Sequence, residues 1–392
     1  MGLDEQPYGY GFPSKMPAQT VQMPPTWMLI VALVGLSGAL LFWCYMALVL
    51  FAPVPREPRR SEKQYMTVLL NGDRSDPKEL PCWIDKWTAE KEVSMRRIGG
   101  KRRETLANIA IEQPELFMSV VVPAYNEEER LTGMLEEAVD YLQQEYVGKG
   151  WEIILVSDGS TDKTVDKALQ FAREHQLSNH RKSVSGPWKD HLKHEQRIPE
   201  GSIRIVELES NRGKGGAVTH GMRHARGQYV VFADADGASR FSDLGKLVEG
   251  CQKIEDDRGR GVAIGSRAHL VGSEAVVKRS KLRNFLMHSF HLLLRLMTPP
   301  ATAAIADTQC GFKLFSRPAL PYIVPYMHSE GWIFDVEMLM LAESGKIPMV
   351  EVAIGWKEVL GSKLNVIWDS LGMAMGLAVL RAAWLAGVYK RD

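Results

Sequence analysis

Apolar runs that end abruptly in polar or acidic residues recur along this chain, and they constrain its fold more than any other feature. They occur in LFMSVVVPAYNEEERL from Leu116, WEIILVSDGSTDKT from Trp151, SIRIVELESNRGKGG from Ser202 and QYVVFADADGAS from Gln228. Helix-like stretches follow the first three. Strands that alternate with helices predict an α/β layer fold with a mostly parallel sheet. The nearly continuous apolar character of these strands indicates a sheet covered on both faces.

The polar residues at the strand ends form a candidate site, because ligands of such sheets bind beyond the carboxyl ends of the strands. Two carboxylates as close as Asp234 and Asp236 repel each other unless a cation lies between them. Their hard oxygen atoms suit Mg²⁺ or Mn²⁺. Lys214, in a glycine-rich turn, is suited to a phosphate. The residues expected at this edge are Asn126, Glu127, Asp158, Lys214, Asp234 and Asp236.

These residues predict a site for a nucleoside diphosphate and a divalent metal. The spacing GxxxxGK[ST] of a P-loop is absent. A dinucleotide-binding GxGxxG motif is absent as well, because Val218 stands where the third glycine is required.

An uncharged segment of 26 residues, from Trp27 to Ala52, is the second strong feature. As a helix it would be about 39 Å long, enough to span a bilayer. It is too long for the apolar part of a cleaved signal peptide and no basic stretch precedes it, so we expect a transmembrane signal anchor. Basic residues follow it at Arg56, Arg59, Arg60 and Lys63, which predicts a lumenal tail at residues 1–26 and a cytoplasmic location for the rest.

Composition excludes several classes of function. The net charge of +1 gives no indication of a nucleic-acid partner. The four cysteines are scattered without a CxxC pair, so neither a zinc knuckle nor a disulfide framework is indicated, and the globular part is typical of a reducing compartment. His220 and His224 share one face of an expected helix, but no carboxylate accompanies them as in HExxH, so we do not expect zinc there.

Residues 53–115 are rich in proline and charge at their start, which predicts an extended linker or stalk. Trp83 and Trp87 would dock a short helix either on the domain or on the membrane surface. Residues 174–201 are expected to form a polar surface insertion. Two apolar stretches, 284–297 and 364–389, are expected to lie at the membrane surface, with burial in the core as the alternative.

Several motifs resemble those of a known family. VVVPAYNEEERL, ILVSDGSTDKT, NRGKGGAV and DADGAS, in this order, resemble glycosyltransferase family 2, the inverting enzymes with a GT-A fold. The later GSR, DTQCGFKLF and GWIFDVEML, with the apolar N-terminal segment, are similar to the members that glucosylate dolichyl phosphate. The resemblance covers about residues 119–363. It implies a cytoplasmic GT-A (Rossmann-like) catalytic domain at residues 116–363 and a membrane-associated C-terminal helix at residues 364–392.

The implied activity is transfer of glucose from UDP-glucose to dolichyl phosphate at the lipid bilayer of the endoplasmic reticulum, with inversion, for N-glycan assembly. The resemblance also implies roles for individual residues. Asp234 and Asp236 form the metal-binding DxD pair, and the metal neutralises the departing UDP, so Asp236 counts as catalytic. Mannosyl-transferring relatives often have a glutamine at the position of Ala238, so a third protein ligand stays open here. The donor-binding residues are Pro123, Ala124, Tyr125, Glu127, Asp158, Lys214 and Asp234.

Basic residues are suited to the acceptor phosphate. For Arg279 and Arg283 a solvated helix face is the alternative. The residues expected at this phosphate are Arg267, Arg279, Arg283 and Lys363.

Asp307 and Asp335 are the candidates for a catalytic base. An acceptor phosphate, however, is already anionic near neutral pH, since its second pKa is about 6. We therefore expect neither aspartate to be an obligatory proton acceptor. Asp307 is expected to orient the acceptor phosphate or its basic partners, and Asp335 to do the same or to cap a helix.

Three rival functions stay open at this point. A related enzyme could transfer mannose from GDP-mannose to the same lipid. A polysaccharide synthase would need several membrane spans, and one is found. A membrane-anchored, non-catalytic nucleotide-binding module would bind UDP without turnover, although the intact Asp158, Lys214, Asp234 and Asp236 argue against it.

Overall fold

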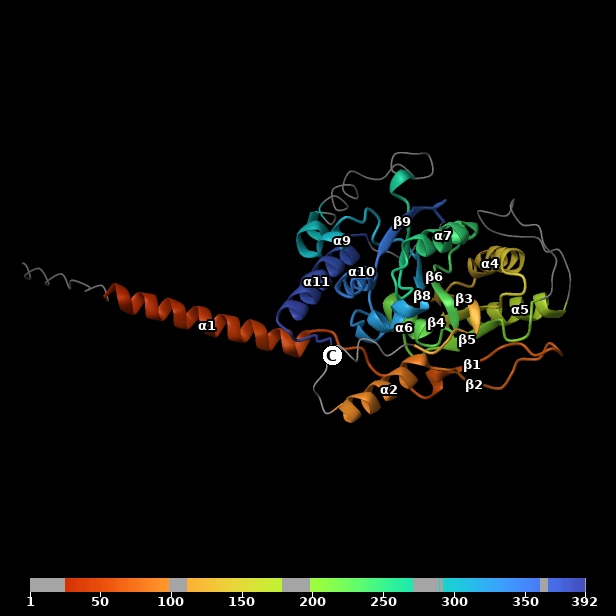
Figure 1. The fold of residues 1–392 in the computed structure, drawn as a ribbon, viewed down its shortest axis with the longest axis horizontal. Coiled ribbons are helices and arrows are strands. Elements are labelled where there is room, and N and C mark those ends of the chain that lie inside the picture. Colours follow the sequence, from red (N-terminus) through yellow and green to blue (C-terminus); the bar gives the residue numbers. More distant parts are fainter. Residues whose placement is uncertain are drawn as a thin grey trace, which may run out of the picture. The chain divides into compact units, whose positions relative to one another are not determined.

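The computed structural model describes residues 25–98, 111–177, 198–270, 289, 292–359 and 366–391 (Figure 1). The chain divides into two compact units, residues 1–51 and residues 52–392. Most of the expected lumenal tail, most of the polar insertion at 174–201, and Arg279, Arg283 and Lys363 lie outside the described residues.

The first unit contains the expected apolar helix, α1, at Thr26–Phe51. None of its residues is buried, and its most apolar 18-residue window has a mean hydropathy of 2.2. Among the described residues it is the one helix that is long and apolar enough to cross a membrane.

The second unit is built on a seven-stranded sheet with the strand order β5-β4-β3-β6-β8-β7-β9. The pairs β3–β4, β3–β6, β4–β5 and β7–β9 are parallel, whereas β8 runs antiparallel to both β6 and β7. The predicted α/β fold with a mostly parallel sheet is therefore confirmed. The strands are β3 (Leu116–Ala124), β4 (Trp151–Ser157), β5 (Ile203–Glu207), β6 (Gly227–Ala233), β7 (Val262–Ser266), β8 (Phe312–Ser316) and β9 (Met349–Ala353).

Helices cover both faces of this sheet, because successive residues of a strand point to opposite sides. Val120 and Val122 of β3 belong to a core cluster with α4, α5 and α7, whereas Val121 belongs to a second cluster with α2, α6 and α10. Both faces are apolar for this reason. The helices of the second unit are α2 (Trp83–Ile98), α4 (Leu131–Glu145), α5 (Thr164–Leu177), α6 (Lys214–Arg223), α7 (Leu244–Ile254), α9 (Pro300–Ala303), α10 (Phe334–Ser344) and α11 (Val366–Leu385).

The strand order reverses at β3. The chain passes from β3 to β4 and β5 on one side and then returns to place β6 on the other side of β3. A crevice at the carboxyl ends of the strands forms at such a reversal. The segments after β3 and β6 therefore lie next to each other, although about a hundred residues separate them in the chain.

Residues 52–98 belong to the same compact unit as the sheet. They form a small antiparallel pair, β1 (Gln64–Tyr65) with β2 (Lys78–Glu79), followed by α2. Trp83 and Trp87 dock on the domain, since both side chains are buried in the core cluster that contains Val121. The proline-rich segment thus leads directly into folded structure instead of a long extended stalk.

The two apolar stretches near the C-terminus present both buried and exposed side chains. In α11, Leu377 and Leu380 are buried, whereas 72% of Trp368 and 70% of Met375 is exposed. In the described part of 284–297, Leu294 is buried and Leu296 is exposed. The described part of each stretch therefore has apolar side chains that pack on the domain and others that are exposed.

Candidate active site

Asp234 and Asp236 lie directly after β6, at the carboxyl edge of the sheet. Each side chain is about one-third exposed, at 32% for Asp234 and 28% for Asp236. Burial and the neighbouring Asp234 raise the pKa of Asp236. Two cations are close by: Lys214 Nζ lies 2.6 Å from Asp234 Oδ1, and Arg130 Nη1 lies 3.9 Å from Asp236 Oδ2.

Lys214 reaches this pair because a tight turn precedes α6. Gly213 adopts φ +83°, and a Cβ atom there would stand 2.6 Å from the carbonyl oxygen of Glu330. A residue with a side chain would be strained in this turn. Burial alone would lower the pKa of Lys214, but Asp234 and Asp335 raise it, so the ammonium stays charged.

Asp158, at the end of β4, is joined to the same turn. Its Oδ1 accepts a 2.7 Å hydrogen bond from the backbone N–H of Arg212, and its carbonyl oxygen accepts one from the side-chain amide of Asn211. Burial raises the pKa of Asp158 to about 6, although the N–H groups of Arg212 and Gly213 oppose the shift. The carboxylate that is expected to contact the uridine therefore faces the segment that presents Lys214.

The segment after β3 lies beside Asp158. Pro123 and Ala124 are the last residues of β3, and Tyr125 is exposed. Asn126 adopts φ 54°, which is uncommon for a residue with a side chain. Its Oδ1 accepts a 2.7 Å hydrogen bond from the N–H of Thr161, so the two loops are tied together. Glu127 forms an ion pair with Arg130.

Arg267 follows β7 and forms a two-pronged ion pair with Asp307. Its Nε and Nη2 lie 2.7 and 2.8 Å from the Asp307 oxygens, and its own N–H donates a third hydrogen bond to Oδ2. Burial would raise the pKa of Asp307, but Arg267 holds it below the usual value. Because the Arg267 side chain is one-third exposed, it can still contact a ligand.

Asp335, in the first turn of α10, is almost completely buried and pairs with the fully buried Lys313 of β8. Lys313 Nζ also donates to the carbonyl oxygen of Cys310. Burial raises the pKa of Asp335, whereas Lys313 and Lys214 oppose the rise. The side chain is bonded to Lys313, and the N-cap position of α10 is occupied by Ile333.

The residues at this edge fit a hard divalent cation. Asp234 and Asp236 provide carboxylate oxygens, the ligand type that Mg²⁺ and Mn²⁺ prefer. Within the described ranges, no group of three or more His, Cys, Asp or Glu side chains is arranged to hold a metal. Ala238 has no side-chain ligand atom; its N–H donates to Asp236 Oδ1, and its carbonyl oxygen accepts from the N–H of Lys357. Two protein carboxylates are therefore available, and water and a diphosphate would complete the coordination.

His220 on α6 and His224 directly after it are buried, and each lies within hydrogen-bond distance of a backbone carbonyl oxygen. His220 Nε2 lies 2.8 Å from the carbonyl oxygen of Glu62, and His224 Nδ1 lies 2.8 Å from that of Pro81. A carbonyl oxygen only accepts, so each of these ring nitrogens carries the proton.

Three residues of this site did not stand out in the sequence: Arg130, Arg212 and Lys313. Arg130 and Arg212 lie inside the recognised motifs, but charged residues of this type are usually solvated. Lys313 lies in the motif DTQCGFKLF, inside an otherwise apolar strand. Because lysine is rarely buried without a partner, this position could have predicted a buried ion pair.

Residues 119–320 match the model of glycosyl transferase family 2. A Saccharomyces cerevisiae protein named dolichyl-phosphate beta-glucosyltransferase is 41% identical over 360 residues, which cover 90% of this chain and 92% of that protein. Proteins of the same name from Drosophila melanogaster and Homo sapiens are 43% and 38% identical and cover 71% and 74% of this chain and 78% and 82% of their own lengths.

Among solved structures, the chain is similar to glucosyl-3-phosphoglycerate synthase from Mycobacterium tuberculosis, crystallised with Mg²⁺ and uridine diphosphate. The identity is 18% and the TM-score is 0.43, over 70% of this chain and 80% of that one.

Proposed function

Since this chain belongs to glycosyl transferase family 2, we propose that it transfers glucose from UDP-glucose to dolichyl phosphate with inversion. Its mostly parallel α/β sheet is the GT-A fold expected from the sequence motifs. The observation that carries the proposal is that Asp158, Lys214, Asp234 and Asp236 lie together at one edge of this sheet. The relatives named dolichyl-phosphate beta-glucosyltransferase, which match most of the chain, support the same activity.

The donor would bind across the carboxyl ends of β3, β4 and β6. We place the uridine at Pro123, Ala124, Tyr125, Glu127 and Asp158. The diphosphate would then lie beside Lys214, whose positive charge stabilises the developing negative charge on the leaving UDP. A divalent metal held by Asp234 and Asp236 would supply further stabilisation of that charge.

The acceptor phosphate would bind at Arg267. A phosphate oxygen of the acceptor attacks the anomeric carbon of glucose from the face opposite the UDP, a new C–O bond forms, and the bond from that carbon to the UDP oxygen breaks. The configuration inverts, and the electron pair leaves on UDP. Asp307 orients Arg267, because it engages both prongs of the guanidinium.

No protein base is required in this scheme, because the attacking phosphate is already an anion. The role left for Asp335 is structural: its ion pair with the buried Lys313 holds that side chain in place. Arg279, Arg283 and Lys363 remain predicted contacts of the acceptor phosphate.

The experiment that tests the proposal is a donor panel with dolichyl phosphate, in Mg²⁺ or Mn²⁺, comparing UDP-glucose, GDP-mannose and UDP-N-acetylglucosamine. We expect turnover with UDP-glucose. Turnover with GDP-mannose alone would replace the proposal with the mannosyl alternative. Binding of UDP without any turnover would indicate a non-catalytic module.

We also propose that α1 anchors the protein in the membrane of the endoplasmic reticulum, with the second unit in the cytoplasm, where its product would serve N-glycan assembly. The apolar length of α1 and the basic residues after Phe51 support this orientation. Protease added to sealed microsomes should digest the second unit and spare a tag at residue 1. The reverse pattern of protection would contradict the orientation.

A further inference from the structure

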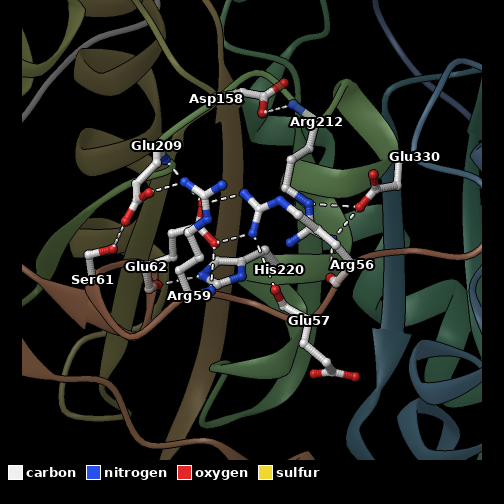
Figure 2. A network of polar contacts seen from close by, with 10 residues as sticks. All are labelled: Arg56, Glu57, Arg59, Ser61, Glu62, Asp158, Glu209, Arg212, His220 and Glu330. Atoms are coloured by element: carbon white, nitrogen blue, oxygen red, sulfur yellow. Dashed lines mark hydrogen bonds and ion pairs between the residues drawn. The ribbon is translucent and has the colours of Figure 1, made fainter.

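Glu62 is a fully buried carboxylate just after α1, and four N–H groups converge on it (Figure 2). Both prongs of the Arg56 guanidinium donate to it, and so do the backbone N–H groups of Arg59 and Glu209. Burial would raise the pKa of Glu62, but these donors lower it to about 2. The carboxylate is therefore charged at neutral pH and fixed in one geometry.

Arg56 connects Glu62 to the donor site through Arg212. Its backbone carbonyl oxygen accepts a 2.9 Å hydrogen bond from Arg212 Nη2, and Arg212 Nε donates at 2.7 Å to Glu330 (Figure 2). The N–H of the same Arg212 donates to Asp158 Oδ1. One continuous set of contacts thus runs from Glu62 through Arg56 and Arg212 to Asp158.

The same segment also holds α6, the helix that begins with Lys214. His220 Nε2 donates to the carbonyl oxygen of Glu62, and Trp83 Nε1 donates at 2.7 Å to that of Met222. His224 adds a bond to Pro81. We call residues 56–83 the clasp, because they hold the turn at 209–213 and the helix that follows it.

We propose that Glu62 and Arg56 are positioning residues of the donor site: through Arg212 they fix the turn that presents Asp158 and Lys214 to a nucleoside diphosphate. The inference rests on the proposed function, which places that diphosphate here. On this proposal the clasp contributes to substrate binding, in addition to connecting α1 to the domain. Neither residue is one of the proposed donor contacts, so both would act on the affinity for the donor indirectly, through Arg212.

The test measures binding of UDP, in Mn²⁺, to the full-length protein in detergent by titration calorimetry. Glu62→Gln keeps the size of the side chain but removes the charge that holds Arg56. We expect the Kd for UDP to rise about tenfold or more, since charge-assisted hydrogen bonds typically contribute that much. The KM for UDP-glucose should rise in parallel, and the KM for dolichyl phosphate should stay unchanged.

Glu152→Gln is the matched control. Glu152 is equally buried and is also bonded to an arginine, Arg226, but it lies at the amino end of the sheet. We expect it to lower the thermal midpoint and leave the Kd for UDP unchanged. A similar rise of Kd in both variants would show a general loss of structure and overturn the proposal.

Arg56→Lys provides a second variant should Glu62→Gln not fold, because Arg56 is partly exposed and the charge is kept. It loses the two-pronged bond to Glu62, so the Kd for UDP should rise several-fold at an unchanged thermal midpoint. Wild-type affinity in Arg56→Lys would overturn the proposal.

A double-mutant cycle tests the route through Arg212. Arg212→Lys breaks the contacts to Arg56 and Glu330, so its loss of affinity should not add fully to that of Glu62→Gln. Fully additive losses would show that Glu62 acts by another route and overturn the proposed one. A wild-type protein that fails to bind UDP would instead refute the donor assignment, which separates that failure from failure of the clasp.

Discussion

The Cα atom of Gly311 lies so close to the carboxylate of Asp234 that a Cβ atom at residue 311 would stand 2.0 Å from Asp234 Oδ2. The Asp234 N–H also donates to the carbonyl oxygen of Gly311 at 3.1 Å. Gly311 directly precedes the antiparallel strand β8, which begins at Phe312 and pairs with β6. This pairing therefore fixes the position of the Asp234 backbone just after β6. A glycine at residue 311 leaves the space that the carboxylate of Asp234 occupies, the carboxylate proposed to bind the metal.

Gly311→Ala should displace Asp234 and weaken metal-dependent transfer. We expect kcat to fall about a hundredfold, since a charge-stabilising contact of the transition state is lost. The measurement is activity against Mn²⁺ concentration, in which the variant should need more metal. Gly38→Ala, in α1, is the control, because an added Cβ there meets no atom within 4 Å. Wild-type metal dependence in Gly311→Ala would show that a glycine at residue 311 is not needed to position Asp234.

Asp236→Asn should reduce transfer about a hundredfold or more at saturating metal, because it removes a charged ligand from the ion that stabilises the leaving diphosphate. Asp166→Asn, on the exposed side of α5, should leave the rate unchanged. Near-normal turnover of Asp236→Asn would show that this aspartate is no essential ligand.

The pH dependence of kcat/KM for dolichyl phosphate, at saturating UDP-glucose, distinguishes an anionic acceptor from a protein base. The acidic limb should follow the acceptor phosphate, with an apparent pKa of about 6. It should therefore survive in Asp307→Asn and Asp335→Asn, with any loss in Asp307→Asn appearing mainly as a higher KM for the acceptor.

Removal of a true general base costs about 10² to 10⁴ in rate and abolishes the limb that reports it. If either variant lost the acidic limb and about a thousandfold in kcat at an unchanged acceptor KM, that aspartate would be the base.

His220 and His224 should make the second unit sensitive to mild acid. Burial lowers their pKa values from 6.5 to about 3 and about 4, and within the described part of the chain the second ring nitrogen of each has no hydrogen-bond partner. The unfolded chain therefore binds protons at a higher pH than the folded one. Stability is fully present above about pH 6.5 and is lost as the pH falls towards 4, by about 2 kcal/mol per histidine at pH 5.

The measurement is the thermal midpoint at pH 7 and at pH 5. The double variant His220→Gln/His224→Asn keeps a donor near each bonded ring nitrogen but cannot titrate. Its midpoint should fall less between the two pH values than that of the wild type. An equal fall in both proteins would assign the acid sensitivity to other groups.

The exposed side of α11 should contact the lipid that carries the acceptor. Trp368 and Met375 lie on one face of this helix and are 72% and 70% exposed. Trp368→Ser/Met375→Ser should raise the KM for dolichyl phosphate in vesicles about tenfold, because the apolar area that enters the lipid is lost. The KM for UDP-glucose should not change.

Leu70→Ser/Val147→Ser provides the control, since both side chains are as exposed as those on α11 but lie elsewhere on the domain. An equal rise of the acceptor KM in the two double variants would argue against a specific lipid contact of α11.

The sequence by itself determined the α/β class, the apolar helix α1 and the edge of the sheet at which the acidic residues meet. These properties depend on local pattern. Continuous apolar runs can be satisfied only in a covered sheet, and residues that follow parallel strands gather at one edge whatever the strand order. Asp158, Lys214, Asp234 and Asp236 were found for that reason.

The tertiary structure alone decided the partners of these residues. That Gly311 faces Asp234, that Lys313 neutralises Asp335, and that Glu62 reaches Arg212 through Arg56 depend on strand β8 and on the segment before α2, which join residues far apart in the chain. No local pattern encodes such contacts. A proline-rich, charged segment looks the same in sequence whether it is solvated or folded onto a domain, and the difference arises only when a buried carboxylate such as Glu62 finds four donors.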